Sequence, residues 1–545
     1  MSAAKEVSDM LRTQRESGVI TDAGNISVKT AILTRGAEAT RVITDELKQM
    51  LEKGVWEPVK GYTLSSVERS RIIRSSMFIR SKYNPDGTFN KLKARLVAGG
   101  DQQDKNIYDD LSSPTVSTSS VFTVMAIAAH EGRKTAVVDV GGAFLNAKMS
   151  GTIPVHMRLD KTMTDFVIGL DKRYRRYTDA GGRVTVLLKR ALYGCVESAG
   201  LWHDNLCVTM GELGYIKNEI DGCVFNRVDH EGVQCTACVH VDDLFITCKN
   251  DKMISELCEG LRAKYGDISL AHGPLINYLG MTVDMTESGQ AKVTMKGYIE
   301  DVLVAAGLPG TARTPATEGL YVIRESAHKV TEHVRVWFHR IVAKLLYVAK
   351  RIRPECLTAV SFLSTRVTKC DEDDVEKLRR KVRYIRKTKD LGLVLRPGVA
   401  GISVRLFVDA SFGVHADGKS HTGSCVVIGD VGAVHCRSVK QQIVSKSSTE
   451  AELIGLSDSA NQGLFVRTFL LAQGYSIVGP VTIYQDNMSC MALLRRGKSG
   501  SERTRHIAIR YFWVKERVVI NEVVIEHKGT KEMYANVLTK PLQGV

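Results

Sequence analysis

Two adjacent aspartates lie between two apolar runs in the stretch CVHVDDLFI, residues 238–246. Both runs have the β-branched and aromatic content of strands, so the pattern predicts a hairpin with an acidic turn. Asp is common in turns because its side chain hydrogen-bonds the local backbone. Asp242 and Asp243 would repel each other, however, and desolvating two carboxylates is costly without a compensating cation. The pair is therefore either an ordinary acidic turn or part of a metal site.

A third aspartate, Asp139, ends the apolar run TAVVDV just before a Gly-Gly break. If this run forms a neighbouring strand of the same sheet, Asp139 can meet Asp242 and Asp243 at one edge. Carboxylate oxygens are ligands that Mg²⁺ prefers, together with water and substrate phosphates. Two such ions about 3.5 to 4 Å apart stabilise the attacking and the leaving oxygen of a phosphoryl displacement. The implied reaction is nucleotidyl transfer.

A second group of acids follows in the C-terminal part of the chain. Asp409 lies inside the strand-like LFVDAS, Glu452 lies near the start of a capped helix at 445–460, and Asp486 lies at a strand-to-helix junction in IYQDN. Acids at the ends of such elements again suggest metal ligands. The sequence therefore predicts a second metal site.

The segments that would position these acids alternate between helical and extended patterns. Leu47, Met50 and Leu51 recur at helical spacing before Gly54, which predicts an amphipathic lead-in helix. The remaining N-terminal predictions are a hairpin over 71–101 that turns at Asn84-Pro85-Asp86-Gly87, a buried helix over 120–132, a strand that runs into Asp139, and a strand followed by a helix over 184–203. This order of mixed strands and helices is typical of an α+β domain.

Further along, a segment rich in Gly, Pro and Thr between about 305 and 335 is predicted to be a linker. Two helical stretches follow, at 336–352 and 373–390, and a strand is predicted at 391–394. A second sheet domain begins near Gly401. No internal repeat is apparent.

The composition favours a polyanionic partner. The net charge is +15, and the basic residues cluster at Lys91/Lys93/Arg95, Arg379/Arg380/Lys381/Arg383 and Arg503/Arg505/Arg510. Such clusters also occur as solvated helix faces, but three of them in one basic chain favour nucleic acid. The helix at 374–390 could follow the backbone of a duplex.

The 12 cysteines show no spacing of a secreted scaffold, and the N-terminus lacks an apolar signal core. Cys235 and Cys238 form a CxxC without a second metal-ligand pair, so buried thiols are the preferred interpretation. No run of 18 apolar residues occurs, and no membrane span is expected. We expect an intracellular chain, in a cytoplasmic particle or the nucleus, and not a secreted one.

Five strings in order resemble the motifs of copia-type retrotransposon Pol polyproteins. They are KARLVAGGDQQ, SSPTVS, VVDVGGAFLNA, LYGCVESAGLW and VHVDDL, and the last of these is similar to the family's YVDD hairpin. Further strings, SSTEAE, QDN, RHIAIRYF and NVLTKPL, resemble the family's RNase H domain. The resemblance runs from about Asp45 to Leu542. It implies a right-hand polymerase with fingers, palm and thumb, a connection segment and a C-terminal RNase H-like α/β domain.

The resemblance also implies roles for individual residues. Asp139, Asp242 and Asp243 would be the catalytic ligands of two metal ions. Lys93 and Arg95 would hold the triphosphate, and Phe144 falls at the steric-gate position that excludes a ribose 2′-OH. The other positions that would border the nucleotide are Val140, Gly141 and Glu197.

In the RNase H-like part, Asp409, Glu452 and Asp486 match three of four metal-binding carboxylates. Glu450 is also acidic, but Glu452 is better placed in the family pattern. Asn536 stands where the family has Asp, and it would be a weaker ligand because an amide brings no negative charge. His527 is expected on a loop, where relatives carry a mobile histidine.

Other departures fall near the first site. Glu197 stands where the family usually has Gln, and Ala199 and Gly200 replace Pro and Arg. A glutamate near a triphosphate adds repulsion. His240 replaces the usual aromatic residue before VDD, so the charge of this ring could vary with pH.

These observations lead to one interpretation and two rivals. The chain is expected to be an RNA- and DNA-directed DNA polymerase with RNase H activity, using Mg²⁺ or Mn²⁺, two ions per site, on an RNA template, a DNA primer, an RNA–DNA hybrid and deoxynucleoside triphosphates. The expected parts are a lead-in at 1–60, fingers and palm at 61–305, linker and thumb or connection helices at 306–400, and an RNase H-like domain at 401–545. The rivals are a decayed relic that binds nucleic acid without catalysis and an unrelated metal-dependent nuclease.

Overall fold

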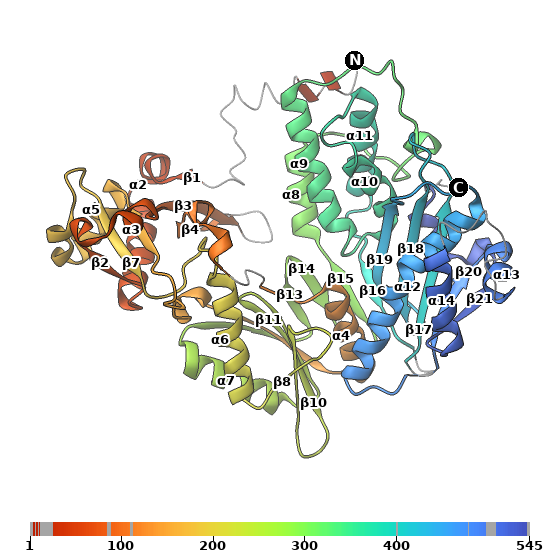
Figure 1. Ribbon diagram of the computed structural model, residues 1–545, viewed down its shortest axis with the longest axis horizontal. Helices are drawn as coiled ribbons and strands as arrows, with labels where there is room; N and C mark the ends of the chain where they lie inside the picture. Colours follow the sequence, from red (N-terminus) through yellow and green to blue (C-terminus); the bar gives the residue numbers. More distant parts are fainter. Residues whose placement is uncertain are drawn as a thin grey trace.

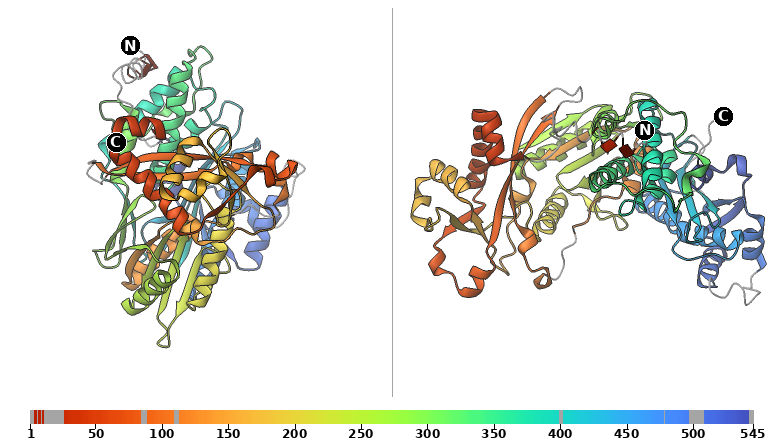
Figure 2. Two further views of the ribbon diagram at one scale, coloured as in Figure 1. Left: turned by 90° about the vertical axis from the view of Figure 1, so that its left-hand side faces the viewer. Right: turned by 90° about the horizontal axis from the view of Figure 1, so that it is seen from above.

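The structure is a computed structural model that describes residues 4–5, 7–8, 10, 26–83, 89–108, 113–398, 402–477, 479–496 and 508–541. Its strands form four sheets in these ranges. The first and fourth sheets lie at opposite ends of the long axis, with the second and third between them (Figures 1 and 2). No helix in the described part is long and apolar enough to cross a membrane.

The first sheet has the strand order β1-β3-β6-β7-β2, and β4 also pairs with β3. The predicted lead-in helix is the C-terminal part of a longer helix that contacts β4, and it buries Leu47 and Met50. The antiparallel hairpin of β3 and β4 is confirmed, while the turn at 84–87 lies outside the described residues. The elements are β1 (Ile26–Ser27), α2 (Val28–Glu52), β2 (Trp56–Val59), α3 (Ser66–Ser70), β3 (Ile73–Tyr83), β4 (Phe89–Ala98), β6 (His156–Leu159), α5 (Lys161–Leu170) and β7 (Val184–Leu188).

The second sheet has the order β12-β5-β11-β10-β9-β8 and is antiparallel throughout. The predicted strand into Asp139 and the predicted hairpin around the aspartate pair belong to this sheet. The predicted buried helix is also present in this part of the chain. Cys235 and Cys238 are buried in β10, as expected. The elements are α4 (Thr118–Glu131), β5 (Lys134–Val140), α6 (Ser198–Glu212), β8 (Ile216–Lys217), β9 (Val224–Val228), β10 (Gln234–His240), β11 (Asp243–Cys248), α7 (Asp251–Tyr265) and β12 (Ile268–His272).

The third sheet has the strand order β13-β14-β15-β16. Four α-helices lie between β15 and β16 in the sequence, and β16 then pairs with β15. The segment predicted as a linker packs into the protein, where Leu320 and Tyr321 are buried. The elements are β13 (Leu275–Tyr278), β14 (Met281–Asp284), β15 (Ala291–Thr294), α8 (Lys296–Ala306), α9 (Glu332–Ala349), α10 (Leu357–Ser364), α11 (Glu372–Lys387) and β16 (Leu393–Leu395).

The basic helix α11 turns part of its predicted cationic face into the protein, while Lys387 at its end is exposed. Lys381 is fully buried. Arg383 and Arg386 donate to the carbonyl oxygens of Pro309 and Leu308 at 2.8 and 2.7 Å. These side chains hold the preceding segment in place, so the prediction that the helix follows a duplex backbone is wrong for them. Arg503 and Arg505 of the third basic cluster lie outside the described residues.

The fourth sheet has the order β19-β18-β17-β20-β21. The strand pairs β17–β20 and β20–β21 are parallel, and the other two pairs are antiparallel. Figure 1 shows α12 and α14 beside this sheet. The elements are β17 (Val404–Ser411), β18 (His421–Ile428), β19 (Ala433–Lys440), α12 (Ser448–Ala472), β20 (Val481–Gln485), α13 (Met488–Arg496), α14 (Ala508–Val519), β21 (Val523–His527) and the short 3₁₀ helix η10 (Tyr534–Leu538).

Helix α4 joins the second and fourth sheets. It is buried on nearly all sides because it contacts β11, β15, β16, β19 and α12, which explains its lack of a polar face. A buried polar cluster seals the same junction, where Arg133 donates to the Tyr475 hydroxyl at 2.7 Å and to the Glu131 carboxylate at 3.0 Å. The described apolar core accordingly runs continuously through the second, third and fourth sheets, while the first sheet has a core of its own.

Two of the quoted motifs meet backbone to backbone. Gly100 of KARLVAGGDQQ lies so close to Gly194 of LYGC that a Cβ on Gly100 would fall 1.9 Å from the Gly194 carbonyl oxygen. A Cβ on Gly194, whose φ is +90°, would fall 2.2 Å from the carbonyl oxygen of Ala98. Only glycine fits at both places. This contact holds the end of β4 against the segment after β7.

We predict that Gly194→Ala destabilises the protein by about 2 kcal/mol or more, because the new methyl group meets backbone atoms at a positive φ. Denaturant unfolding monitored by circular dichroism measures the change. The matched control is Gly211→Ala on α6, where no atom lies within 4 Å of the added Cβ and where the higher helix propensity should stabilise by about 0.5 to 1 kcal/mol. Equal stability of the Gly194 variant and the wild type would contradict the close backbone approach.

Candidate active sites

Asp139 and Asp243 lie directly opposite each other on β5 and β11. The Val140 amide donates to the carbonyl oxygen of Asp242 at 3.0 Å. Asp139 and Asp243 are therefore a non-hydrogen-bonded pair, in which the backbone N–H and C=O groups do not bond across to the opposite residue. Such pairs have the shorter Cα separation of the two antiparallel types, and their side chains are closer. Like charges directly opposite destabilise a sheet. The register therefore concentrates negative charge at the end of β5.

The two central residues of the β10–β11 turn are Val241 and Asp242, because His240 pairs with Asp243. The prediction of a turn made of both aspartates is thus wrong by one residue, since Asp243 begins the strand. Val241 has a φ of +60°, which is strained for a β-branched residue. The indole nitrogen of Trp202 donates to its carbonyl oxygen at 2.7 Å, and this bond helps to hold the turn. Strained turns of this kind occur at functional sites.

A hollow of about 920 Å³ opens beside Asp139. Lys93 and Arg95 of β4 line it, together with Gly141 and Tyr193. Lys93 is exposed and Arg95 is half-buried. The structure therefore brings the predicted triphosphate cations and the first aspartate around one hollow.

Helix α2 forms another wall of this hollow, which the sequence analysis missed. Arg41, Asp45 and Gln49 line it from this helix, and their spacing of four residues could have indicated a common polar face. Glu46 accepts from the Leu96 amide at 3.0 Å. Burial raises the pKa of Glu46, while this hydrogen bond and the charges of Lys93 and Arg95 oppose the rise.

A further acid, Asp267, also lines the hollow and was not predicted. Its carbonyl oxygen accepts from the Gly141 amide at 3.0 Å. A Cβ on Gly141 would lie 3.0 Å from an oxygen of its carboxylate. The predicted nucleotide residue Gly141 therefore sits against a further negative charge.

The other predicted nucleotide residues lie at different distances from the hollow. Val140 is buried in the core. Phe144 contacts the ring of Tyr193, which lines the hollow. Glu197 does not line it: one carboxylate oxygen accepts from the Ser150 hydroxyl at 2.8 Å, and the other is buried without a hydrogen-bond partner.

His240 is half-buried next to the turn. Burial lowers the pKa of this histidine, the charge of Arg351 lowers it further, and Asp242 opposes both effects. The ring is therefore neutral at neutral pH. It adds no positive charge beside the aspartates.

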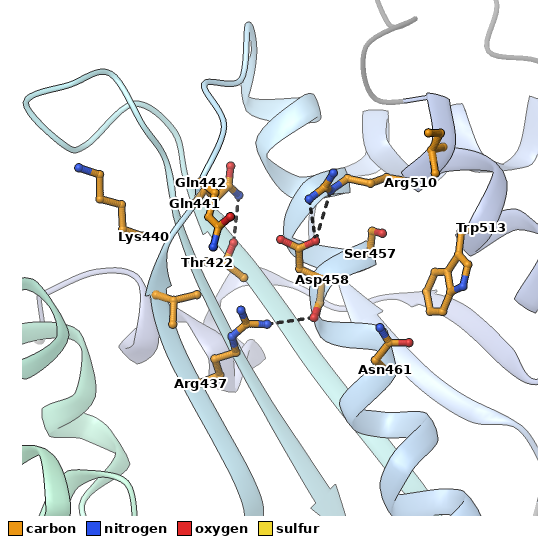
Figure 3. A pocket seen from close by; sticks show the side chains of 12 residues that line it. Thr422, Arg437, Lys440, Gln441, Gln442, Ser457, Asp458, Asn461, Arg510 and Trp513 are labelled. Atoms are coloured by element: carbon orange, nitrogen blue, oxygen red, sulfur yellow. Dashed lines mark hydrogen bonds and ion pairs between the residues drawn. The ribbon is translucent and has the colours of Figure 1, made fainter. Parts of the chain in front are cut away.

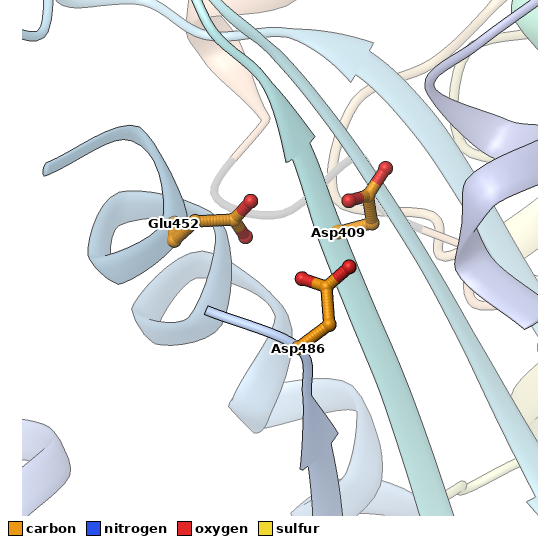
Figure 4. Close-up of side chains that lie close together, drawn as sticks. All are labelled: Asp409, Glu452 and Asp486. Atoms are coloured by element: carbon orange, nitrogen blue, oxygen red, sulfur yellow. The ribbon is translucent and has the colours of Figure 1, made fainter. Parts of the chain in front are cut away.

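The second group of acids converges closely (Figure 4). Asp409 from β17, Glu452 from α12 and Asp486 after β20 offer oxygen atoms that all lie within 4.8 Å of one another. Burial raises the pKa of Glu452 to about 8, and the charges of Asp409 and Asp486 add to the rise. Among the described acids, histidines and cysteines, no other group of three is this compact. The Asp139 group is therefore less tightly gathered.

Asn536 lies at the edge of this second site. Lys540 places its amine 3.3 Å from a carboxylate oxygen of Asp409 and 2.8 Å from the side-chain oxygen of Asn536. The Thr539 hydroxyl donates to Asp409 as well, and Thr530 donates to Asp486 at 3.0 Å. A protein cation thus occupies one side of the acidic cluster.

Two neighbours of the cluster lie elsewhere. Glu450 accepts from the Lys446 amide at 2.7 Å, at the start of α12, and is not part of the compact group. His527 is exposed at the end of β21, so the prediction that it lies on a loop is wrong. Its strand partner, Gln485, directly precedes Asp486.

A separate hollow of about 740 Å³ lies between β19, α12 and α14 (Figure 3). Its cations already have partners. Arg510 pairs with Asp458 at 3.1 Å, Arg437 donates to the Asp458 carbonyl at 3.0 Å, and Lys440 pairs with Asp417 at 2.7 Å. Each of these cations is therefore already held by a group of the protein.

Comparison with known proteins agrees with the motifs. The family model described as reverse transcriptase (RNA-dependent DNA polymerase) matches residues 60–317. The Retrovirus-related Pol polyprotein from transposon RE1 of Arabidopsis thaliana is 26% identical, over 86% of this chain and 31% of the relative. The corresponding protein from transposon TNT 1-94 of Nicotiana tabacum is 24% identical, over 92% and 36%. The chain spans about a third of the length of these relatives.

A solved structure shares the fold. The foamy viral protease-reverse transcriptase in complex with RNA/DNA hybrid aligns with a TM-score of 0.51 and 11% identity, over 91% of this chain and 54% of that one. At this identity the likeness concerns the mixed α/β fold. The sequence matches and the fold agree: residues 60–317 match the reverse transcriptase family model, and the chain is similar over most of its length to the Pol polyproteins of the transposons RE1, RE2 and TNT 1-94.

Proposed function

We propose that the chain is an RNA- and DNA-directed DNA polymerase. The observation that carries the proposal is the direct pairing of Asp139 with Asp243 beside a hollow lined by Lys93 and Arg95. Carboxylates directly opposite each other repel, and cations next to them suit a triphosphate. The reverse transcriptase family match over the same region supports this reaction.

Asp139, Asp242 and Asp243 would hold the metal ions, since carboxylate oxygens suit Mg²⁺ or Mn²⁺. When bound, two ions would neutralise the charge that develops on the attacking and leaving oxygens. Lys93 and Arg95 bind the triphosphate of the incoming nucleotide. The primer 3′-OH attacks the α-phosphate and pyrophosphate leaves, so the protein contributes mainly positioning and electrostatics.

Phe144 supplies sugar selection in this proposal. An aromatic ring beneath the sugar leaves no room for a 2′-OH, which favours deoxynucleotides. Glu197, in contrast, lies apart from the hollow and is bonded to Ser150. We therefore leave Glu197 out of the proposed nucleotide site, although it falls within a family motif.

The fourth sheet is proposed to hydrolyse the RNA strand of an RNA–DNA hybrid. Asp409, Glu452 and Asp486 would hold two metal ions; burial, followed by the charges of Asp409 and Asp486, raises the pKa of Glu452, and a bound cation would offset both effects. Asn536 would be a weak fourth ligand, because its oxygen already accepts from Lys540.

The four sheets correspond in this proposal to the parts of a right-hand polymerase and its RNase H-like domain. The first sheet corresponds to fingers, the second to palm, the third with α8 to α11 to thumb and connection, and the fourth to the RNase H-like domain. The fold shared with a reverse transcriptase solved on an RNA/DNA hybrid supports this arrangement. The partners are an RNA template, a DNA primer, the hybrid and deoxynucleoside triphosphates. A location in a cytoplasmic particle or the nucleus stays a prediction.

A second candidate is a relic that binds nucleic acid without cleaving it. Two observations favour it for the second site: Asn536 replaces an acid, and Lys540 contacts Asp409 where a metal ion could otherwise compensate its charge. The first site retains all three of its aspartates. The two candidates therefore differ in whether nucleotides are added and RNA is cut.

We expect the purified chain to extend a DNA primer on an RNA template with Mg²⁺ or Mn²⁺, and Asp242→Asn with Asp243→Asn to abolish extension. Removing two carboxylates leaves the ions without most of their ligands. Asp229→Asn, in a turn at the other end of β10, is the matched control and should keep wild-type extension. A folded wild type that binds primer-template and adds no nucleotide with either metal would support the relic instead.

We expect Asn536→Asp to increase RNA cleavage in a labelled RNA–DNA hybrid several-fold, because a fourth carboxylate strengthens metal binding and competes for Lys540. The measurement is the initial rate of RNA cleavage, with primer extension recorded in parallel. Asn521→Asp makes the same charge change in the turn before β21 and should leave the rate unchanged. An unchanged or lower rate for Asn536→Asp would show that this residue is not a metal ligand.

We expect Mn²⁺ to raise the melting temperature through the second site. The test uses the Asp139→Asn, Asp242→Asn, Asp243→Asn background, in which the first site cannot contribute. Free metal at 100 times its Kd adds about 2.7 kcal/mol to the free energy of unfolding. Glu452→Gln should remove most of this gain and Glu450→Gln should keep it. Equal gains in both variants would rule out Glu452 as a ligand.

A further inference from the structure

We propose that Tyr193 is a positioning residue that couples the binding of the triphosphate to the selection of the sugar. It does so by contacting both Arg95 and Phe144. This inference rests on the proposed polymerase function and adds a residue that neither the motifs nor the family match assigns.

The first contact is with the triphosphate cation. The guanidinium carbon of Arg95 lies 4.5 Å from the centre of the Tyr193 ring. A cation over an aromatic face is attracted by the ring quadrupole, and more strongly where water is excluded. Arg95 is half-buried at this place. Its side chain is thus held in one orientation toward the hollow before any nucleotide arrives.

The second contact is with the proposed sugar gate. The rings of Phe144 and Tyr193 have centroids 4.6 Å apart and an interplanar angle of 76°. This edge-to-face geometry is a favoured arrangement of aromatic pairs. Phe144 lies partly exposed on a short 3₁₀ turn, η4 (Ala143–Asn146), and its inner side packs against the main apolar core. Tyr193 therefore helps to set the position of the gate from the side of the hollow.

The backbone of Tyr193 is itself fixed. Its carbonyl oxygen accepts from the Ala98 amide at 2.7 Å, and the next residue, Gly194, is wedged against Ala98 and Val97. Burial raises the pKa of the Tyr193 hydroxyl to about 12, and the charges of Asp242 and Asp139 contribute. The side chain thus stays a neutral ring close to the acids, on a backbone that cannot move easily.

This arrangement has a mechanical consequence. A triphosphate that draws Arg95 toward it changes the cation's contact with the Tyr193 ring, and the ring passes the change to Phe144. Because the backbone is fixed, the response is confined to the side chains. Sugar selection then depends on how the phosphates are held.

The test compares Tyr193→Leu with Tyr193→Phe in single-nucleotide extension, using dTTP and UTP. Tyr193→Phe keeps both ring contacts and should resemble the wild type. Tyr193→Leu should raise the KM for dTTP by about 2- to 30-fold, the range expected for a lost cation–π contact. It should also narrow the dTTP-to-UTP ratio of kcat/KM, which a purely structural defect would not move. Tyr177→Leu is the matched control, since it removes a comparable stack with Arg176 in the 3₁₀ helix η5 (Lys172–Tyr177), which packs against the first sheet.

Arg95→Lys gives a second measurement that does not depend on how Tyr193→Leu folds. Lysine keeps the charge but loses the planar stack. If Arg95 only attracts phosphate, the dTTP-to-UTP ratio stays at its wild-type value, and the coupling is overturned. If Tyr193 links the two, the ratio narrows as in Tyr193→Leu.

The outcomes separate this inference from the proposed function. An active wild type whose Tyr193→Leu and Arg95→Lys variants keep the wild-type ratio overturns the coupling alone. A folded wild type that adds no nucleotide overturns both. A narrower dTTP-to-UTP ratio of kcat/KM in both Tyr193→Leu and Arg95→Lys, with an unchanged ratio in Tyr193→Phe and Tyr177→Leu, supports the coupling.

Discussion

Carboxylate repulsion is the constraint around which both sites are built. On the second sheet it arises from register, because Asp139 and Asp243 are opposite each other in the closer type of antiparallel pair. On the fourth sheet it arises from convergence, because a strand, a helix and a strand end bring three acids within 4.8 Å. The rest of the fold keeps these acids in place despite their mutual repulsion, through continuous sheets, the shared core and hydrogen bonds to the turn.

The charged groups around the repelling carboxylates differ between the two sites. At the second site a cation of the chain itself, Lys540, lies 3.3 Å from Asp409. At the first site Lys93 and Arg95 line the same hollow of about 920 Å³ as Asp139. The second site is thus partly compensated by a lysine of the chain, and the first site places charges of both signs around a hollow with room for a ligand.

The sequence predicted the elements well where a long apolar run or an ordered motif marked them. The apolar α4, the strand into Asp139 and the helix carrying Glu452 follow from residue patterns and from motifs of known order. It failed where tertiary contacts decide. The position of the turn at Val241 depends on strand register, and the inward cations of α11 depend on carbonyl groups of residues 308 and 309. The contribution of α2 to the first hollow, and the Arg95–Tyr193–Phe144 contacts, join segments far apart in the chain, which no local pattern reports.

The junction built around α4 has a consequence for the products. A helix buried between two sheets, sealed by Arg133, Glu131 and Tyr475, leaves the two groups of acids at one separation. If both act on the same duplex, the protein and not the nucleic acid sets the length between the growing end and the cut. RNA fragments left behind the growing end would then share a characteristic size.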